Sequence, residues 1–161
     1  ALAVGTTFAL LKANTEPVTN TFTAAKSDIK IDEDVTGGQK TSIIVQNTGT
    51  AVSYVRVKLV MNWVDESDNV SAEPVNITPS ITADWFEQDG IYYYKMPVAA
   101  KGETTNLLKD PITQGTAPAG CHLEVTVLAE SIQAAPSKAV TDSWGVGVDS
   151  NGYLTQPTTT P

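Results

Sequence analysis

The chain has 161 residues, which is enough for one domain with a sizeable core. Eighteen Asp and Glu residues outweigh ten Lys and Arg residues, giving a formal net charge of −8. This charge argues against nucleic acid or an anionic membrane surface as a partner, because both bind basic surfaces. Charged residues make up only 17% of the chain, a balance more typical of a secreted, extracellular β-protein than of a cytosolic helical enzyme.

The chain opens with an apolar stretch, ALAVGTTFALL. It is shorter than the roughly 20 apolar residues of a membrane span, and it lacks the positively charged region of a secretory signal. We therefore expect residues 1–12 to be covered by protein and the mature chain to have no membrane partner. Residues 13–18 are polar, include Pro17 and are expected to form a linker. In an extended conformation, one face of the apolar stretch carries Val4, Thr6, Phe8 and Leu10.

Residues 19–154 are expected to form a single β-sandwich domain, because strand-like alternation recurs along them while helical periodicity is nearly absent. Gly, Pro, Asn and Asp residues separate the alternating segments. Strands are predicted within residues 27–33, 37–51, 53–64, 91–96 and 122–134.

The segment 53–64, SYVRVKLVMNWV, has the clearest period-two pattern. Its apolar face is predicted to lie in the core and carries Val55, Val57, Leu59, Met61 and Trp63. Its opposite face is predicted to point away from the core and carries Tyr54, Arg56, Lys58, Val60 and Asn62.

The C-terminal part contains one short helix candidate, residues 135–144, with Ser137 as a possible cap. A hairpin with its turn at Asn151 and Gly152 follows. The Thr- and Pro-rich tail, residues 155–161, is expected to be extended. These elements together predict an all-β fold, an antiparallel jelly-roll-like β-sandwich.

Motifs for catalysis are missing from the sequence. His122 is the single histidine, so a two-histidine zinc motif is ruled out, and neither GxSxG nor a phosphate loop occurs. Cys121 precedes His122, but neighbours in a strand point to opposite faces, which disfavours a Cys–His nucleophile. Asp65, Ser67 and Asn69 have the spacing of calcium ligands, although a solvated loop explains them more simply. We therefore predict no catalytic residue, no metal site, no cofactor and no enzymatic activity.

The aromatic residues allow two interpretations, a carbohydrate-stacking platform or core packing with cross-strand pairs, and the second is favoured. The residues concerned are Trp63, Trp85, Phe86, Tyr92, Tyr93 and Tyr94.

Four segments resemble the TasA/camelysin family of Gram-positive bacteria, whose leader is removed by a SipW-type signal peptidase. They are TNTFTAAKSDIKIDE, YVRVKLVMNW, WFEQDGIYYYKMPVAAKGETTNLLKDPI and the late LAESIQA followed by Trp144. The resemblance extends from about Thr19 to Trp144. It implies a secreted jelly-roll-like protein that assembles into biofilm-matrix fibres at the cell surface.

The resemblance also implies a role for the apolar N-terminus. In filaments of this family the segment acts as a donor strand that completes a sheet of the next subunit, so residues 1–12 would pair with another copy of the chain. Donor and acceptor are different surfaces, so the contact is heterologous and propagates as a helical filament. Insertion of the segment into its own subunit would bury the same face, and the sequence pattern does not separate these two possibilities.

Two other functions are compatible with parts of the sequence. Some relatives in the family are described as metalloproteases, although no zinc motif supports that activity here. A monomeric surface adhesin or carbohydrate-binding module is the other alternative, and it depends on the aromatic residues alone.

Overall fold

A computed structural model of the protein describes residues 29–36 and 39–157. Strands dominate this part of the chain, and every strand pair is antiparallel, which confirms the predicted all-β class. The jelly-roll connectivity, the donor strand and the domain boundaries stay predictions. The elements are β1 (Ile29–Thr36), β2 (Gln39–Asn47), β3 (Ser53–Asp65), β4 (Trp85–Gln88), β5 (Ile91–Tyr94), β6 (Cys121–Gln133), α1 (Lys138–Trp144), β7 (Gly147–Val148) and β8 (Leu154–Thr155).

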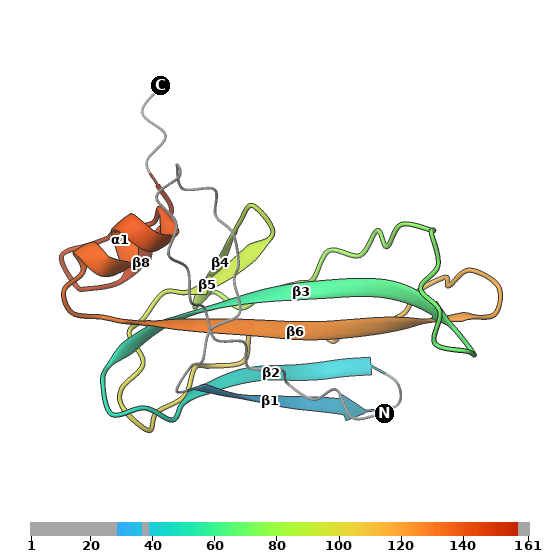
Figure 1. The fold of residues 1–161 in the computed structure, drawn as a ribbon, viewed down its shortest axis with the longest axis horizontal. Helices are drawn as coiled ribbons and strands as arrows, with labels where there is room; N and C mark the ends of the chain where they lie inside the picture. Colours follow the sequence, from blue (N-terminus) through green and yellow to red (C-terminus); the bar gives the residue numbers. More distant parts are fainter. Residues whose placement is uncertain (1–28, 37–38, 158–161) are drawn as a thin grey trace.

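The main sheet has four strands in the order β4-β5-β3-β6 (Figure 1). β3 and β6 are each 13 residues long and pair along their whole length, from Ser53 opposite Gln133 to Asp65 opposite Cys121. β4 and β5 form a short hairpin whose turn residues, Asp89 and Gly90, both have positive φ, as tight hairpin turns require. β6 is therefore a long strand at one margin of this sheet.

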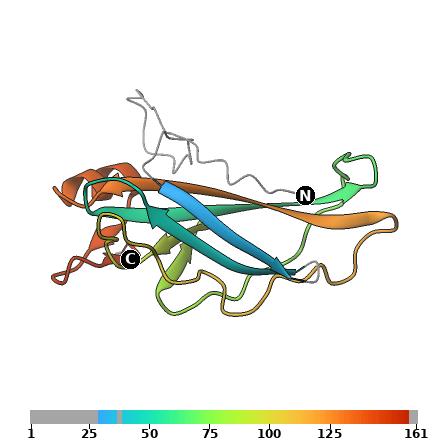
Figure 2. The same ribbon diagram turned by 90° about the horizontal axis from the view of Figure 1, so that it is seen from below.

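The β1–β2 hairpin forms a second layer that crosses over β3 and β6, with β1 lying against β6 (Figure 2). Ile31, Ile43 and Val45 from the hairpin share one apolar cluster with Val57 and Val127 of the main sheet. Alternation explains this packing, because every second side chain of each strand points to the same layer boundary.

The opposite face of the main sheet is also covered, at the end where α1 and the β7–β8 hairpin lie (Figure 1). Tyr54 and Arg56, predicted to point away from the core, are 3% and 2% exposed there. The prediction of a half-buried strand is therefore wrong for the start of β3, because Val140 and Trp144 of α1 complete a second apolar cluster over that face. The four residues of β5 are all buried for the same reason.

The predicted helix and the predicted C-terminal hairpin are both observed. α1 begins after Ser137, which occupies the N-cap position without a capping hydrogen bond from its side chain. The helix ends at Gly145, whose φ of 67° is the left-handed conformation that favours glycine. In the β7–β8 hairpin, the Asp149 side chain accepts hydrogen bonds from the backbone N–H groups of Asn151 and Tyr153.

Candidate assembly surface

The outer edge of β6 has no described strand beside it. In an antiparallel strand, the N–H and C=O of one residue point to the same side, and those of the next residue point to the other side. The N–H of Leu123 bonds to the side chain of Gln114 and that of Cys121 bonds to Pro118, so the odd-numbered residues of β6 face away from β3. Within residues 29–36 and 39–157, the outward N–H and C=O groups of the next odd-numbered residues have no hydrogen-bond partner. We call these groups the open edge, and they belong to Val125, Val127 and Ala129.

Apolar side chains accompany the open edge on the face of the sheet that β1 and β2 pack against. Val125 of β6 lies opposite Met61 of β3, while Leu123 lies opposite Trp63 and Leu59 lies opposite Val127. Leu59, Met61, Leu123 and Val125 are only partly buried at the edge of the main core. Further along the same face, Val127 and Ala129 are fully buried. At Val125 an added strand would meet backbone groups of the open edge beside a partly uncovered apolar surface. Val127 and Ala129 are 1% and 0% exposed, so an added strand would have to displace what covers their outward groups.

A buried ion pair holds β6 to its single described neighbour in the sheet. Arg56 of β3 and Glu130 of β6 lie opposite one another, with Nε of Arg56 2.5 Å from Oε2 of Glu130, and each side chain is 2% exposed. The guanidinium also lies 4.8 Å from the centre of the Trp144 ring, a cation–π distance. Sequence reasoning missed this pair because Arg56 and Glu130 are 74 residues apart and Arg56 was predicted to point away from the core.

The predicted core residues of the 53–64 strand divide into two groups. Val55, Val57 and Trp63 are buried, whereas Leu59 and Met61 are partly buried. The indole N–H of Trp63 donates to the Pro74 carbonyl oxygen at 3.2 Å. The partly buried pair is the one that lies beside the open edge.

The aromatic residues considered as a carbohydrate platform are at most 9% exposed, and they form core pairs. Phe86 stacks on Tyr93, and Trp85 packs against Tyr94, with ring centres 5.0 Å and 5.1 Å apart. Burial raises the pKa of the Tyr93 hydroxyl, while the Arg56 charge opposes that shift. None of these rings presents a free face for a sugar.

The candidate calcium ligands lie in an exposed turn after β3. The carboxylate of Asp65 accepts hydrogen bonds from the backbone N–H groups of Asn69 and Ser67, and those bonds lower its pKa. No group of three or more His, Cys, Asp or Glu side chains in the described part of the chain could hold a metal ion. Cys121 is partly exposed and His122 is exposed.

The predicted donor-strand residues, Val4, Thr6, Phe8 and Leu10, lie outside the described residues, as do the linker and the end of the tail. Within residues 29–36 and 39–157, no helix is long and apolar enough to cross a membrane. No family model, no curated protein sequence and no solved structure matches this chain.

Proposed function

We propose that the protein is the structural subunit of an extracellular filament, in which the apolar N-terminal segment of one copy adds as a strand to the open edge of β6 in the next copy. The proposal explains two features of the chain together, the apolar N-terminal segment and the open edge of β6. Residues 1–12 are an apolar stretch that needs cover, and the open edge is a row of backbone groups that needs a neighbouring strand. The observation that supports it is that the outward groups of Val125, Val127 and Ala129 have no hydrogen-bond partner within residues 29–36 and 39–157.

The dimensions and the chemistry of the two features agree. Nine residues of β6, from Leu123 to Ser131, extend about 30 Å at roughly 3.3 Å per residue, which a segment of similar length can pair with. Val4, Phe8 and Leu10 would then lie over the partly buried side chains of Leu59, Met61, Leu123 and Val125. The contact is heterologous, so it leaves one donor and one acceptor unused at the ends and propagates as a filament.

Assembly requires both apolar burial and backbone hydrogen bonds to offset the free-energy cost of association. Burying three large apolar side chains contributes about 1.5–3 kcal/mol each, while association costs about 4–15 kcal/mol of lost freedom. Each new backbone hydrogen bond adds about 0.5–1.5 kcal/mol. The apolar contacts alone leave little surplus, so assembly depends on pairing along the edge as well.

The test uses two full-length variants that differ only in which face of the N-terminal segment is charged. Phe8→Asp with Leu10→Asp should abolish filaments in electron micrographs, because a carboxylate buried without a partner is strongly disfavoured. Thr7→Asp with Ala9→Asp charges the opposite face and should leave assembly largely intact. A synthetic peptide of residues 3–12 should bind the Phe8→Asp, Leu10→Asp protein, whose open edge is unoccupied, and the same peptide should shorten wild-type filaments.

The proposal fails if the Phe8→Asp, Leu10→Asp protein forms filaments of normal length. It also fails if the intact protein is monomeric at high concentration with residues 1–12 protected from protease, because that result means that the segment inserts into its own subunit.

A further inference from the structure

The outer edge of β2 is closed by an irregular part of the chain, residues 102–112, which we call the edge-closing segment. From residue 43 to residue 47 the outward residues of β2 are odd-numbered, and the segment supplies a partner for each of their outward N–H groups. Nearer the start of β2, beyond a shift in register, Lys40 faces outward and bonds to Ile112. It forms no regular strand, and only isolated bridges join it to β2, at Lys40 opposite Ile112 and Gln46 opposite Glu103.

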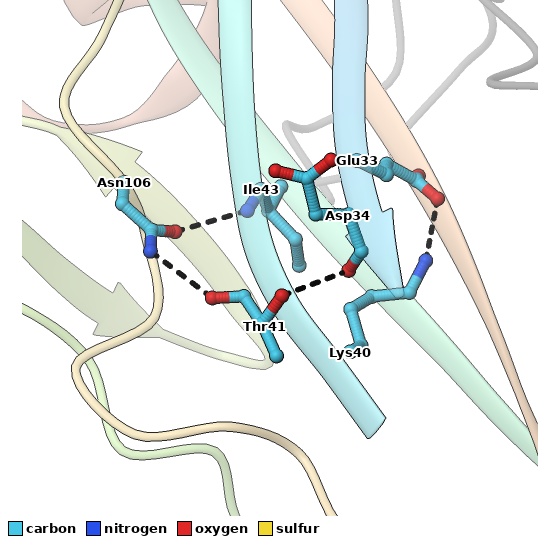
Figure 3. Close-up of polar contacts among 6 residues, drawn as sticks. All are labelled: Glu33, Asp34, Lys40, Thr41, Ile43 and Asn106. Atoms are coloured by element: carbon cyan, nitrogen blue, oxygen red, sulfur yellow. Dashed lines mark hydrogen bonds and ion pairs between the residues drawn. The ribbon is translucent and has the colours of Figure 1, made fainter. Parts of the chain in front are cut away.

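Side chains of the edge-closing segment replace the carbonyl groups that a regular strand would offer. The Asn106 side-chain oxygen accepts from the N–H of Ile43 at 2.9 Å, and its side-chain nitrogen donates to the Thr41 carbonyl oxygen at 3.2 Å (Figure 3). The Thr104 hydroxyl accepts from the N–H of Val45 at 3.0 Å. A side-chain amide has the same donor and acceptor groups as a peptide bond, so it can stand in for one.

Backbone groups of the segment complete the edge. The N–H groups of Leu107 and Thr104 donate to the carbonyl oxygens of Ile43 and Val45, each at 2.9 Å. The Asn47 N–H donates to the Gly102 carbonyl oxygen at 2.8 Å. The outer edge of β2 therefore offers no unpaired N–H or C=O between residues 43 and 45 to another chain.

The far side of the edge-closing segment is itself a poor template for strand addition. Its backbone bonds to residues 80–82, with the Thr82 N–H donating to Leu107 at 3.0 Å and the Lys109 N–H donating to Ser80 at 2.9 Å. Its exposed positions include charged residues and a proline, which block strand pairing, namely Glu103, Lys109, Asp110 and Pro111.

We propose that the edge-closing segment acts as a built-in block on strand addition, which restricts association between copies of this chain to the β6 side. Asn106 and Thr104 are its key residues, because their side-chain oxygens occupy the places where carbonyl groups of a second copy would otherwise accept from the N–H groups of β2. The proposal rests on the proposed function in taking strand addition as the mode of association and β6 as the side that accepts it. It predicts that opening the β2 edge creates a second association route that does not need the N-terminal segment.

The experiment introduces Thr104→Val with Asn106→Ala into the full chain that already carries Phe8→Asp and Leu10→Asp. Hydrogen exchange at the amides of Ile43 and Val45, measured at a concentration low enough to keep the protein monomeric, should become about tenfold faster or more, because each loses its acceptor. Sedimentation should show new dimers or larger species, while the parent protein stays monomeric. Thr105→Val is the matched control, because the Thr105 hydroxyl lies in the same segment but donates to Asp84 at 2.8 Å instead of to β2.

Asn106→Asp gives a milder variant in case the double substitution does not fold. It keeps the acceptor for the N–H groups of Ile43 and Leu108 but loses the donor to Thr41, so the exchange at Ile43 should change less than in the double variant. The proposal is overturned if the Ile43 and Val45 amides exchange at the parent rate in the folded double variant, or if the Ile43 amide does so in Asn106→Asp. It is also overturned if these amides open and the protein stays monomeric. Filaments formed by the Phe8→Asp, Leu10→Asp parent would instead count against the proposed function alone.

Discussion

The outer edges of β2 and β6 are both margins of antiparallel sheets, but their backbone groups end in different environments. On β2, the groups of Ile43 and Val45 bond to residues 104–107. On β6, the outward groups of Val125, Val127 and Ala129 have no partner among the described residues. An unpaired strand edge promotes aggregation, so proteins usually cover it. In the part of the chain that the structure describes, specific side chains cover the β2 edge and the β6 edge is left unpaired. We therefore expect an added strand to bind at β6 and not at β2.

Breaking the attachment of β6 should have the largest effect on stability. Glu130→Ala removes the carboxylate that lies 2.5 Å from Nε of the buried Arg56 and should cost about 3–5 kcal/mol. Replacing both residues, as Arg56→Met with Glu130→Leu, removes the charge and should cost clearly less. Chemical denaturation of the two proteins measures the difference, and an equal loss in both would show that the ion pair does not hold β6 in place.

Leucines on the two sides of the molecule should respond differently to truncation. Leu107 lies in the edge-closing segment and is 0% exposed, so Leu107→Ala should lower the free energy of unfolding by about 2–5 kcal/mol. Leu123 lies beside the open edge and is partly buried, so Leu123→Ala should cost the monomer about 1 kcal/mol.

Filament formation should be impaired more by Leu123→Ala than by Leu107→Ala, the reverse of their order in monomer stability. The critical concentration for filament formation should rise for Leu123→Ala, because an added strand would bury that side chain further. If Leu123→Ala destabilises the monomer as much as Leu107→Ala does, the open side is already covered in the monomer.

The smallest effect is expected at Gln114, whose exposed side chain accepts from the Leu123 N–H at 3.3 Å. Gln114→Ala should change the free energy of unfolding by less than about 0.5 kcal/mol, as most surface substitutions do. It also frees one more N–H on the edge of β6, so filaments should grow no more slowly than in the wild type. Light scattering from matched concentrations compares the growth rates, and slower growth would mean that this hydrogen bond supports assembly.

Alternation in the sequence was enough to predict the strands and one of their faces. Val55 and Val57 are buried where the period-two pattern puts them, because one face of the strand meets the β1–β2 layer. The pattern could not show that α1 covers the other face, since that depends on a segment that follows β6 in the chain.

The two sheet margins were beyond prediction for a related reason. Asn106 lies 63 residues from Ile43, in a segment with no regular period, so nothing local marks its amide as a substitute for a peptide group. The open edge is likewise a property of strand order, which places β6 at the margin of the main sheet. A sequence pattern reports which face of a strand is apolar, but it does not report which of its edges has a neighbour.

Amide hydrogen exchange on monomer and filament tests the central claim most directly, because it reads the two edges separately. We predict that the amides of Val125, Val127 and Ala129 exchange at least about tenfold more slowly in the filament than in the monomer, as each gains a partner. The amides of Ile43 and Val45, already bonded, should exchange at the same rate in both states. Equal protection of the β6 amides in monomer and filament, or new protection confined to β2, would contradict the account.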